Sequence, residues 1–316
     1  MTDDAATFAA TFRRRVPDIL VDWCGEERID RALAENLRLE LARCTDPEFA
    51  ASFAQACPVD GCEPDEYLQR ILTVGPRQRL LVGIRFLSHP DFPFVDIVAG
   101  TELLADAASL RRAVDLVRQE YASFKPRAVR LLRGFEEPPV IPPEWDSSVD
   151  QYIVAAPLEE LCRRPPLERQ SRVELVPVDD LGESAEFVRR AYEEFFDENP
   201  GFRDILQVGE YDDLKSCRDG GVVMYIHVDG ERAGLLATDQ VLGPLVEGQT
   251  VVEEILVTGF RGRGLAPVAQ QQLVEQLVDD HPDDILRGTI DARNRASLAT
   301  AKRVGREVVA AYHWIQ

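Results

Sequence analysis

The sequence predicts an α/β protein, or α+β in the looser sense, built as two tandem domains. Its 316 residues suit two domains of ordinary size. Apolar runs with helical and strand periods alternate along both halves, which is typical of layered α/β domains. Two proline-bearing segments, 136–145 and 162–172, interrupt this alternation, because clustered prolines fit neither a helix nor a central strand. We place the boundary after the second segment, so the predicted domains are 1–167 and 168–316.

The first half is expected to begin with helices and to continue with strands. One apolar stripe recurs every four residues, at Ile29, Leu33, Leu37 and Leu41. The strand-like runs RLLVGIRF and FPFVDIVAG precede a helix, SLRRAVDLVRQEYASF, and a further strand, AVRLL. This half contains no recognisable site.

The second half shows the same alternation more fully. The strand VELVPV precedes two helices, AEFVRRAYEEFF and one in EYDDLKSCRD, and three strands, VVMYIHV, AGLLATDQV and VVEEILV. Asp229-Gly230 between two apolar runs indicates a hairpin. A helix, the strand ILRGTI, another helix after Asn294 and a last strand, REVVAAYHWI, follow.

Composition limits the classes of function. A hydrophobic fraction of 45% and a charged fraction of 29% are those of a folded chain. The net charge of −20 disfavours nucleic acid as a partner and favours a cationic small molecule or basic peptide, although acidity also simply keeps a protein in solution. No apolar run approaches a membrane span and no secretory signal is recognised, so we expect a cytoplasmic protein without a membrane partner. The sequence carries no signal for oligomeric state.

The cysteines do not suggest a metal site. Six are scattered along a chain that has only four histidines. Cys57 and Cys62 form the only close pair, and no second pair follows at the spacing of a zinc site. We therefore expect reduced thiols and no metal.

The segment best suited to chemistry spans residues 251–277. A strand runs directly into Arg261-Gly262-Arg263-Gly264-Leu265-Ala266, where a helix begins. Glycines let the backbone approach a ligand closely, the first turn of a helix has free amides, and two arginines add charge. These properties predict an anion cradle that suits a pyrophosphate. Taken alone, the six residues also fit an ordinary glycine turn that caps a surface helix.

The same residues resemble the signature Arg/Gln-x-x-Gly-x-Gly/Ala of the GNAT (Gcn5-related N-acetyltransferase) superfamily, with Arg261, Gly264 and Ala266 at its defining positions. A second motif supports the resemblance: Asn294, Ser297 and Gly305 match the helix-capping pattern that these domains place after the next strand. The resemblance covers about residues 170–316. It implies a mixed central sheet flanked by helices. The first half has the coarse order of a degenerate GNAT-like domain without the loop.

The resemblance implies that acetyl-CoA, or another acyl-CoA, is the co-substrate. The loop would grip the pyrophosphate, and the strand before it would diverge from its neighbour and offer backbone groups to the pantetheine arm. The residues expected to contact the cofactor are Leu256, Val257, Thr258, Arg261, Gly262, Arg263, Gly264, Leu265, Ala266, Asn294 and Ser297. Cations around the second motif are candidates for the 3′-phosphate, namely Arg293, Arg295, Lys302 and Arg303.

Direct acyl transfer needs a general base for the amine. Glu253 and Glu254 are the candidates, and at most one faces the cleft because adjacent strand residues face opposite sides. Spacing in related domains favours Glu254. Many GNAT enzymes protonate the thiolate with a Tyr seven residues after the motif's Asn, where this chain has Ala301. Tyr312 on the last strand is the candidate substitute, against the alternative that it is simply packed.

A GNAT domain usually has two strands after its second helix, whereas this chain has one. We therefore expect a strand from the first half, within 150–156, to complete the sheet.

The function expected is an N-acetyltransferase that acts on a primary amine of a small, cationic molecule. Alternatives are a protein amino group as acceptor and a non-catalytic acyl-CoA sensor or scaffold, which Ala301 motivates. An aminoacyl-tRNA-dependent transferase ranks last, because a strongly acidic chain matches tRNA poorly.

Overall fold

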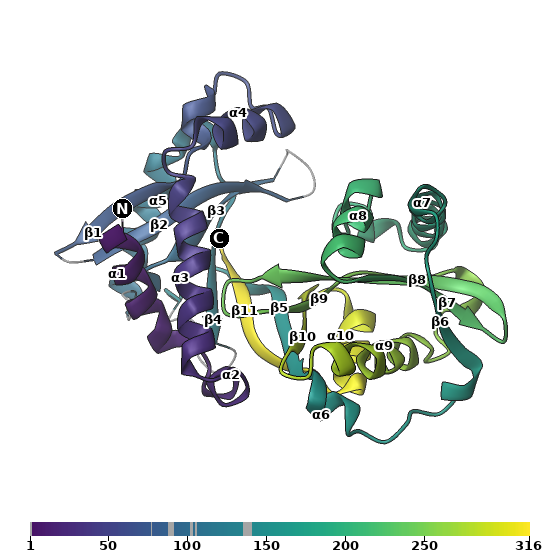
Figure 1. Cartoon of the computed structure of the whole chain (residues 1–316). Helices are drawn as coiled ribbons and strands as arrows, with labels where there is room; N and C mark the ends of the chain where they lie inside the picture. The colour runs from purple at the N-terminus through teal and green to yellow at the C-terminus, as the bar shows by residue number, and fades with distance from the viewer. Residues whose placement is uncertain (1, 77, 88–91, 102–103, 105, 135–140) are drawn as a thin grey trace. The chain divides into compact units, whose positions relative to one another are not determined.

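A computed structural model describes the chain except for residues 1, 77, 88–91, 102–103, 105 and 135–140 (Figure 1). Residues 136–140 of the first proline-bearing segment therefore lie outside the described residues. The chain forms two compact units. The first comprises Met1–Tyr152, Pro244–Val246 and Val309–Gln316, and the second Ile153–Gly243 and Glu247–Val308.

These units do not follow a division between residues 167 and 168. Residues 153–167 belong to the second unit, because strand β5 (Ser147–Pro157) runs into helix α6 (Leu158–Cys162), which packs on α9 (Ala266–Asp280). Residues 309–316 belong to the first unit, because strand β11 (Glu307–Ile315) pairs antiparallel with β4 (Ala128–Gly134). Strands β5 and β11 thus contribute residues to both units.

The first unit begins with helices and continues as a sheet. Its elements before β4 are α1 (Thr2–Phe12), α2 (Asp18–Cys24), α3 (Glu26–Ala42), α4 (Pro47–Ala56), β1 (Arg70–Gly75), β2 (Gln78–Phe86), β3 (Pro93–Ala99) and α5 (Ala107–Glu120). The strand order is β1-β2-β3-β4-β11-β5. From β1 to β3 the strands are antiparallel, β3 and β4 are parallel, and β4 and β11 are antiparallel. The expected stripe on α3 is buried at all four positions. Strand β1 was not predicted, because its sequence RILTVG does not alternate between apolar and polar residues.

The second unit contains a mixed sheet between two pairs of helices, as the family resemblance implies. Its elements after α6 are β6 (Val173–Pro177), α7 (Leu181–Glu198), α8 (Tyr211–Gly220), β7 (Val222–Val228), β8 (Glu231–Leu242), β9 (Glu247–Leu256), α9, β10 (Ile285–Asp291) and α10 (Arg295–Val304). The strand order is β5-β10-β9-β8-β7-β6, parallel between β9 and β10 and antiparallel from β9 to β6. Figure 1 shows α7 and α8 on one face and α9 and α10 on the other. β5 beside β10 confirms the strand expected from the first half.

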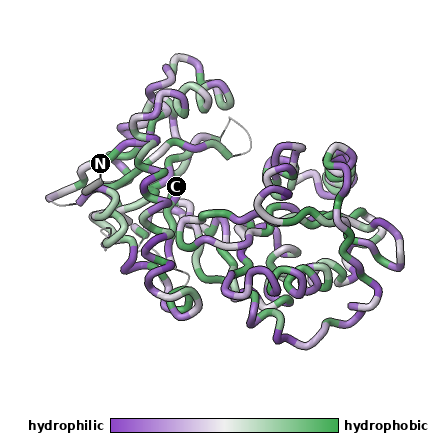
Figure 2. The backbone as a smooth tube through the Cα atoms, in the orientation of Figure 1, coloured by the Kyte–Doolittle hydropathy of each residue, from purple (hydrophilic) through white to green (hydrophobic). Residues whose placement is uncertain are grey.

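Local sequence explains where these elements begin and end. Asp229 and Gly230 have φ of 52° and 84°, the left-handed backbone of the predicted hairpin turn between β7 and β8. The buried face of α9 includes Ala269, Leu273 and Leu277. Figure 2 shows hydrophobic residues running along β7 to β9. Across the described residues, no helix is both long and apolar enough to pass through a lipid bilayer.

Candidate functional site

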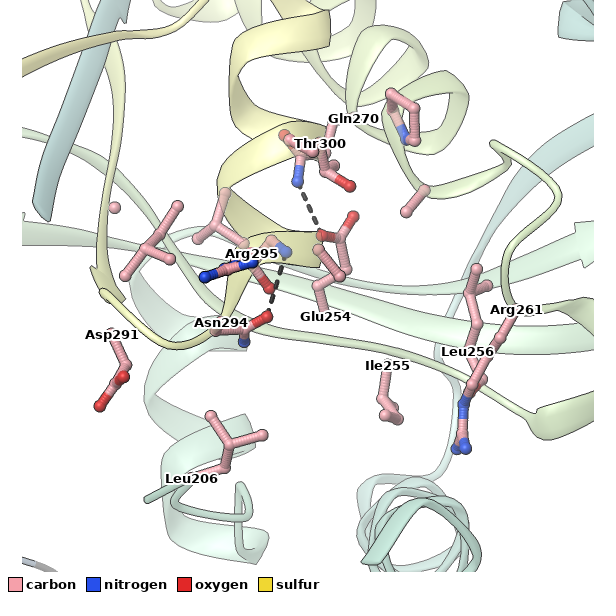
Figure 3. Close-up of a pocket in the computed structure, with 18 of the residues that line it drawn as sticks. Leu206, Glu254, Ile255, Leu256, Arg261, Gln270, Asp291, Asn294, Arg295 and Thr300 are labelled. Carbon is pink, nitrogen blue, oxygen red and sulfur yellow. Dashed lines mark hydrogen bonds between the residues drawn. The ribbon is translucent and has the colours of Figure 1, made fainter. Parts of the chain in front are cut away.

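A cavity of about 730 Å³ lies within the second unit, where β9 and β10 diverge (Figure 3). Among the described residues, their parallel pairing joins only Gln249 to Leu286 and Thr250 to Arg287. Beyond these pairs both strands line the cavity, β9 as far as Leu256 and β10 over residues 288–291. The cavity therefore occupies the gap that the two strands leave in the sheet.

A β-bulge lies where the strands begin to diverge. Ala237 of β8 is opposite Glu253 and Thr238 is opposite Val251, so Val252 is the extra residue on β9. Such a bulge bends a strand and increases its local twist. The side chain of Val252 lines the cavity and, with 46% of the residue exposed, is among the most exposed large hydrophobic residues described.

The predicted glycine loop forms one side of the cavity. Gly262 and Gly264 line it with φ of 70° and 72°, a backbone that residues with a Cβ rarely adopt. Helix α9 begins directly after Leu265, which is buried and anchors the turn. Ala266 and Pro267 of its first turn also line the cavity, so the amide end of the helix lies at this wall.

The two arginines of the loop have other partners than a ligand. Arg261 donates from Nε to the carbonyl of Leu256 at 2.6 Å and from Nη2 to the carbonyl of Ala191 at 2.8 Å. It also pairs with Glu198 at 3.2 Å and lies over the ring of Phe195. Arg261 therefore fastens the loop to α7. Arg263 lies over the ring of Phe260 and is not among the cavity-lining residues.

The second predicted motif caps α10 as expected. Asn294 Oδ1 accepts a hydrogen bond from Ser297 N at 3.1 Å, and Gly305 ends the helix with φ of 117°. Asn294 and Ser297 both line the cavity.

Two arginines of α10 supply cations to the cavity. Arg295 and Arg303 line it, and within the described residues neither forms an ion pair. Arg303 lies beside the loop, its Nη1 3.2 Å from where a Cβ on Gly264 would stand. Arg293 is instead paired with Asp291 at 2.7 Å, and Lys302 does not line the cavity.

Of the two adjacent carboxylates, Glu254 lines the cavity and Glu253 does not. Glu254 Oε2 accepts from Gln270 Nε2 at 2.8 Å, and Gln270 Oε1 accepts from Arg306 Nη2 at 2.7 Å, so the amide bridges a carboxylate and a guanidinium. Figure 3 shows Gln270 above the carboxylate. Burial raises the pKa of Glu254 to about 7, against the opposing influence of Arg306 and Gln270. Burial lowers the pKa of Arg306 to about 10.

Glu253 points to the α7 face of the sheet. It is 2% exposed and accepts hydrogen bonds from Tyr192 Oη at 2.7 Å and from Gly209 N at 3.0 Å. Burial raises its pKa to about 7 as well. Gln270, Arg306 and Tyr192 were all missed by sequence reasoning, because each lies far along the chain from its carboxylate and belongs to no recognised motif.

The α7 side of the cavity is largely apolar. Its lining residues there are Tyr192, Phe195, Asn199, Phe202 and Leu206. Phe195, Phe202 and Leu206 are partly exposed and pack against the core cluster beneath α7. A ligand that reaches this wall meets aromatic and aliphatic surface and the amide of Asn199.

The backbone groups that were expected to contact the pantetheine arm, those of Leu256, Val257 and Thr258, do not all face the same edge of β9. Val257 N donates to Ala233 O at 2.9 Å, which joins it to β8. Because strand residues alternate between edges, the backbone groups of Leu256 face the side from which β10 has diverged. Leu256 lines the cavity, whereas Val257 and Thr258 do not.

Tyr312 lies in the first unit, and it is not among the cavity-lining residues. On β11 it is opposite Leu132 of β4, and the guanidinium of Arg130 lies 4.4 Å from the centre of its ring. Arg130 in turn pairs with Asp96 at 2.8 Å and with Asp150 at 2.9 Å. Ala301 is fully buried on α10. The tyrosine that lines the cavity is Tyr192.

No protein-family model and no curated protein matches the chain. Solved structures that resemble it include a GCN5-related N-acetyltransferase from Sphaerobacter thermophilus, at 16% identity over 87% of this chain and 94% of that chain, with a TM-score of 0.49. Another is a GCN5-related N-acetyltransferase from Kribbella flavida, at 14% identity over 86% of this chain and 95% of that chain, with a TM-score of 0.47. A tandem GNAT protein from the clavulanic acid biosynthesis pathway is also similar, at 12% identity over 75% of this chain and 78% of that chain, with a TM-score of 0.44. Likeness at this level concerns the fold and leaves the activity to the chemistry of the site.

Proposed function

We propose that the second unit binds an acyl-CoA, most simply acetyl-CoA, in this cavity and transfers the acyl group to a primary amine, as GNAT N-acetyltransferases do. One observation carries the proposal. The gap between β9 and β10 is bordered by the glycine loop at the start of α9 and by the carboxylate of Glu254. Anion binding and proton acceptance thus meet in one cavity.

The loop side suits the charged part of coenzyme A. Amides at the start of α9 and the helix dipole favour a diphosphate. Arg303 beside Gly264 supplies the charge that was expected of Arg261, and Arg295 adds a second. The carbonyl of Leu256 already accepts from Arg261 Nε, and its outward N–H can donate to a carbonyl of a pantetheine arm, which would bring the thioester towards Glu254.

The reaction then follows from the position of Glu254. A neutral amine attacks the carbonyl carbon, and its proton passes to the carboxylate directly or through water. A pKa of about 7 suits a base that works near neutral pH. Gln270 and Arg306 hold this carboxylate in place and favour its charged form.

The acceptor would be a small amine on an apolar body. The wall of Phe195, Phe202 and Leu206 favours an aromatic or aliphatic body, and the net charge of −20 favours a cationic group. The alternative is an acyl-CoA sensor without turnover, since the buried Ala301 leaves no hydroxyl at the family's usual acid position.

Turnover separates these two functions. The protein is mixed with acetyl-CoA and a panel of alkyl, arylalkyl and polyamine substrates, and free thiol is followed. We expect thiol release that depends on the amine and is fastest with arylalkylamines. Coenzyme A binding without thiol release across the panel would instead identify a sensor.

A loop variant tests the placement of the diphosphate. Gly264→Asp should abolish coenzyme A binding measured by calorimetry, because it places a carboxylate at the cradle and ties up Arg303. Gly259→Asp is the charge control, since a Cβ there meets nothing within 4 Å and Gly259 does not line the cavity. Gly230→Asp is the strain control, at a φ of 84° in the β7–β8 turn. Retained affinity in Gly264→Asp would refute the cradle.

A further inference from the structure

We propose that Tyr192 is a catalytic residue of this site, the acid that protonates the departing thiolate, and that Glu253 is the positioning residue that resupplies its proton. The inference rests on the proposed function and fills the role left open by Ala301. Among the described residues that line the cavity, Tyr192 is the only tyrosine.

The contact between Tyr192 and Glu253 supplies the geometry. Tyr192 extends from α7 to the sheet, where its hydroxyl lies 2.7 Å from Glu253 Oε1. Glu253 and Glu254 are adjacent on β9 and face opposite sides, so one lies in the cavity wall and the other behind Tyr192. The site therefore has an acid–base group on each face of β9, at the level where β10 diverges.

The surroundings of the pair determine its protonation. Tyr192 faces Glu253 and is influenced by the charges of Glu254 and Arg261, and burial raises its pKa well above the ordinary value. Glu253 also faces the amide of Gly209 and the carboxylate of Asp213 on α8. The nearby thiol of Cys217 on α8 has its pKa raised to about 12 and stays neutral. Near neutral pH the phenol is thus protonated, whereas Glu253 populates both forms.

The protonation of Glu253 sets the direction of the hydrogen bond. When Glu253 is ionised, the phenol donates its proton to the carboxylate. When Glu253 is protonated, it donates to the phenol oxygen, and the phenolic hydrogen is released from the carboxylate and can be donated to a group in the cavity that Tyr192 lines. The protonated carboxyl therefore prepares Tyr192 as a donor.

The proton balance closes with this pair. The amine forms the C–N bond and gives one proton to Glu254, and the carbonyl π pair moves to oxygen. As the carbonyl re-forms, the C–S bond breaks with its electron pair on sulfur. Sulfur takes the phenolic proton of Tyr192, and the phenolate takes the carboxyl proton of Glu253. Exchange with water then moves one proton from Glu254 back to Glu253.

The role predicts a specific pH dependence. Glu254 must be ionised and Glu253 protonated, so kcat at saturating substrates should pass through a maximum near pH 7 and fall on the alkaline side as Glu253 ionises. The charge of each carboxyl influences the pKa of the other. The apparent pKa values of the acidic and alkaline limbs therefore describe Glu253 and Glu254 together.

The test uses variants of the full chain with acetyl-CoA and the best amine of the panel. Tyr192→Phe should lower kcat by about 10- to 100-fold, leave coenzyme A affinity unchanged and remove the alkaline limb. Glu253→Gln should do the same, because an amide cannot resupply the proton. Tyr225→Phe is the matched control, as this buried tyrosine of the same core does not line the cavity and should retain wild-type kcat.

The outcomes are distinct. Wild-type kcat and an intact alkaline limb in Tyr192→Phe would overturn the role of Tyr192 while the transferase stands. Absence of thiol release by the wild-type protein with every amine would overturn the proposed function and this inference together. A loss of kcat in both variants without a change in the pH profile would reduce the pair to a packing role and also contradict the proposal.

Discussion

Two arginines at the cavity, Arg261 and Arg303, differ in what their guanidinium groups already bind. Arg261 is 19% exposed and engages two carbonyls and Glu198, so a ligand would have to compete with these partners. Arg303 lies beside Gly264 on the exposed side of α10 and forms no ion pair with the residues that the structure describes. The sequence motif marks Arg261 as the anion ligand, but hydrogen bonds to α7, invisible in the sequence, give it a different task.

Removing the charge of Arg303 should therefore lower the affinity for coenzyme A. Arg303→Gln should weaken coenzyme A binding by about 5- to 10-fold at low salt, and by less at high salt because exposed charges are screened. Lys302→Gln, the neighbouring exposed cation that does not line the cavity, should leave affinity unchanged. Calorimetry at two ionic strengths measures both, and equal losses in the two variants would mean that only net charge matters.

Glu253 makes stability depend on pH. Its pKa is raised from 4.5 to about 7 in the folded protein, so the folded state holds the proton more tightly than the unfolded chain. Its contribution to stability is therefore full below about pH 4.5 and is lost as pH rises through 7. Between pH 5 and pH 8 the free energy of unfolding of the wild-type protein should fall by about 1–3 kcal/mol more than that of Glu253→Gln, because glutamine does not ionise.

Urea unfolding at both pH values measures this difference. The exposed Glu194→Gln on α7 is the control and should show no such change. An equal response of both variants would contradict the effect of burial.

At the scale of elements, what a sequence reveals depends on how near the partners lie along the chain. The caps of α10 were predicted because Asn294 bonds Ser297 three residues away and Gly305 acts through its own backbone. Strand alternation allowed only one of Glu253 and Glu254 to face the cleft, and spacing in related domains favoured Glu254. The neighbouring glutamines of α9 were not assigned, because Gln271 contacts Leu167 and Pro165, about a hundred residues earlier. Such pairings follow from tertiary packing.

Removing the side chain of Gln271 should loosen the segment between α6 and β6. Its side chain accepts from Leu167 N at 2.8 Å and donates to Pro165 O at 3.0 Å, which fastens the segment between α6 and β6 to α9. Gln271→Ala should speed tryptic cleavage after Arg163 or Arg169 several-fold, with little change in melting temperature. Gln276→Ala, an exposed glutamine of the same helix, is the control. Unchanged cleavage of Gln271→Ala would show that the segment is held by other contacts.

At the scale of the whole molecule, the division at 167/168 and the compact units differ because residues 153–161, from the end of β5 and from α6, precede the second proline-bearing segment yet belong to the second unit. Leu158 and Leu161 of α6 are 0% and 2% exposed, so the segment contributes to a core. A missing strand in the family pattern indicated β5. No local feature indicated that the end of β11 belongs with β4, since both strands are simply apolar.

A pair of fragments tests this account. Residues 147–308 should unfold cooperatively in urea, whereas 168–308 should not, because removing β5 exposes the edge of β10 and removing α6 uncovers α9. Circular dichroism follows both transitions. Cooperative unfolding and coenzyme A binding by 168–308 would show that β5 is dispensable.

The pairing of β4 with β11 has a consequence for how the protein is made. Val129 of β4 lies opposite Ile315 of β11, although the two strands are far apart in the sequence. During translation β4 therefore leaves the ribosome long before β11 is made. While the intervening chain is translated, the nascent β4 lacks this neighbour, and the later-encoded unit can finish folding before the earlier one closes. Chaperones that shield apolar strand edges should therefore engage the nascent chain soon after β4 emerges and stay bound until β11 has been translated.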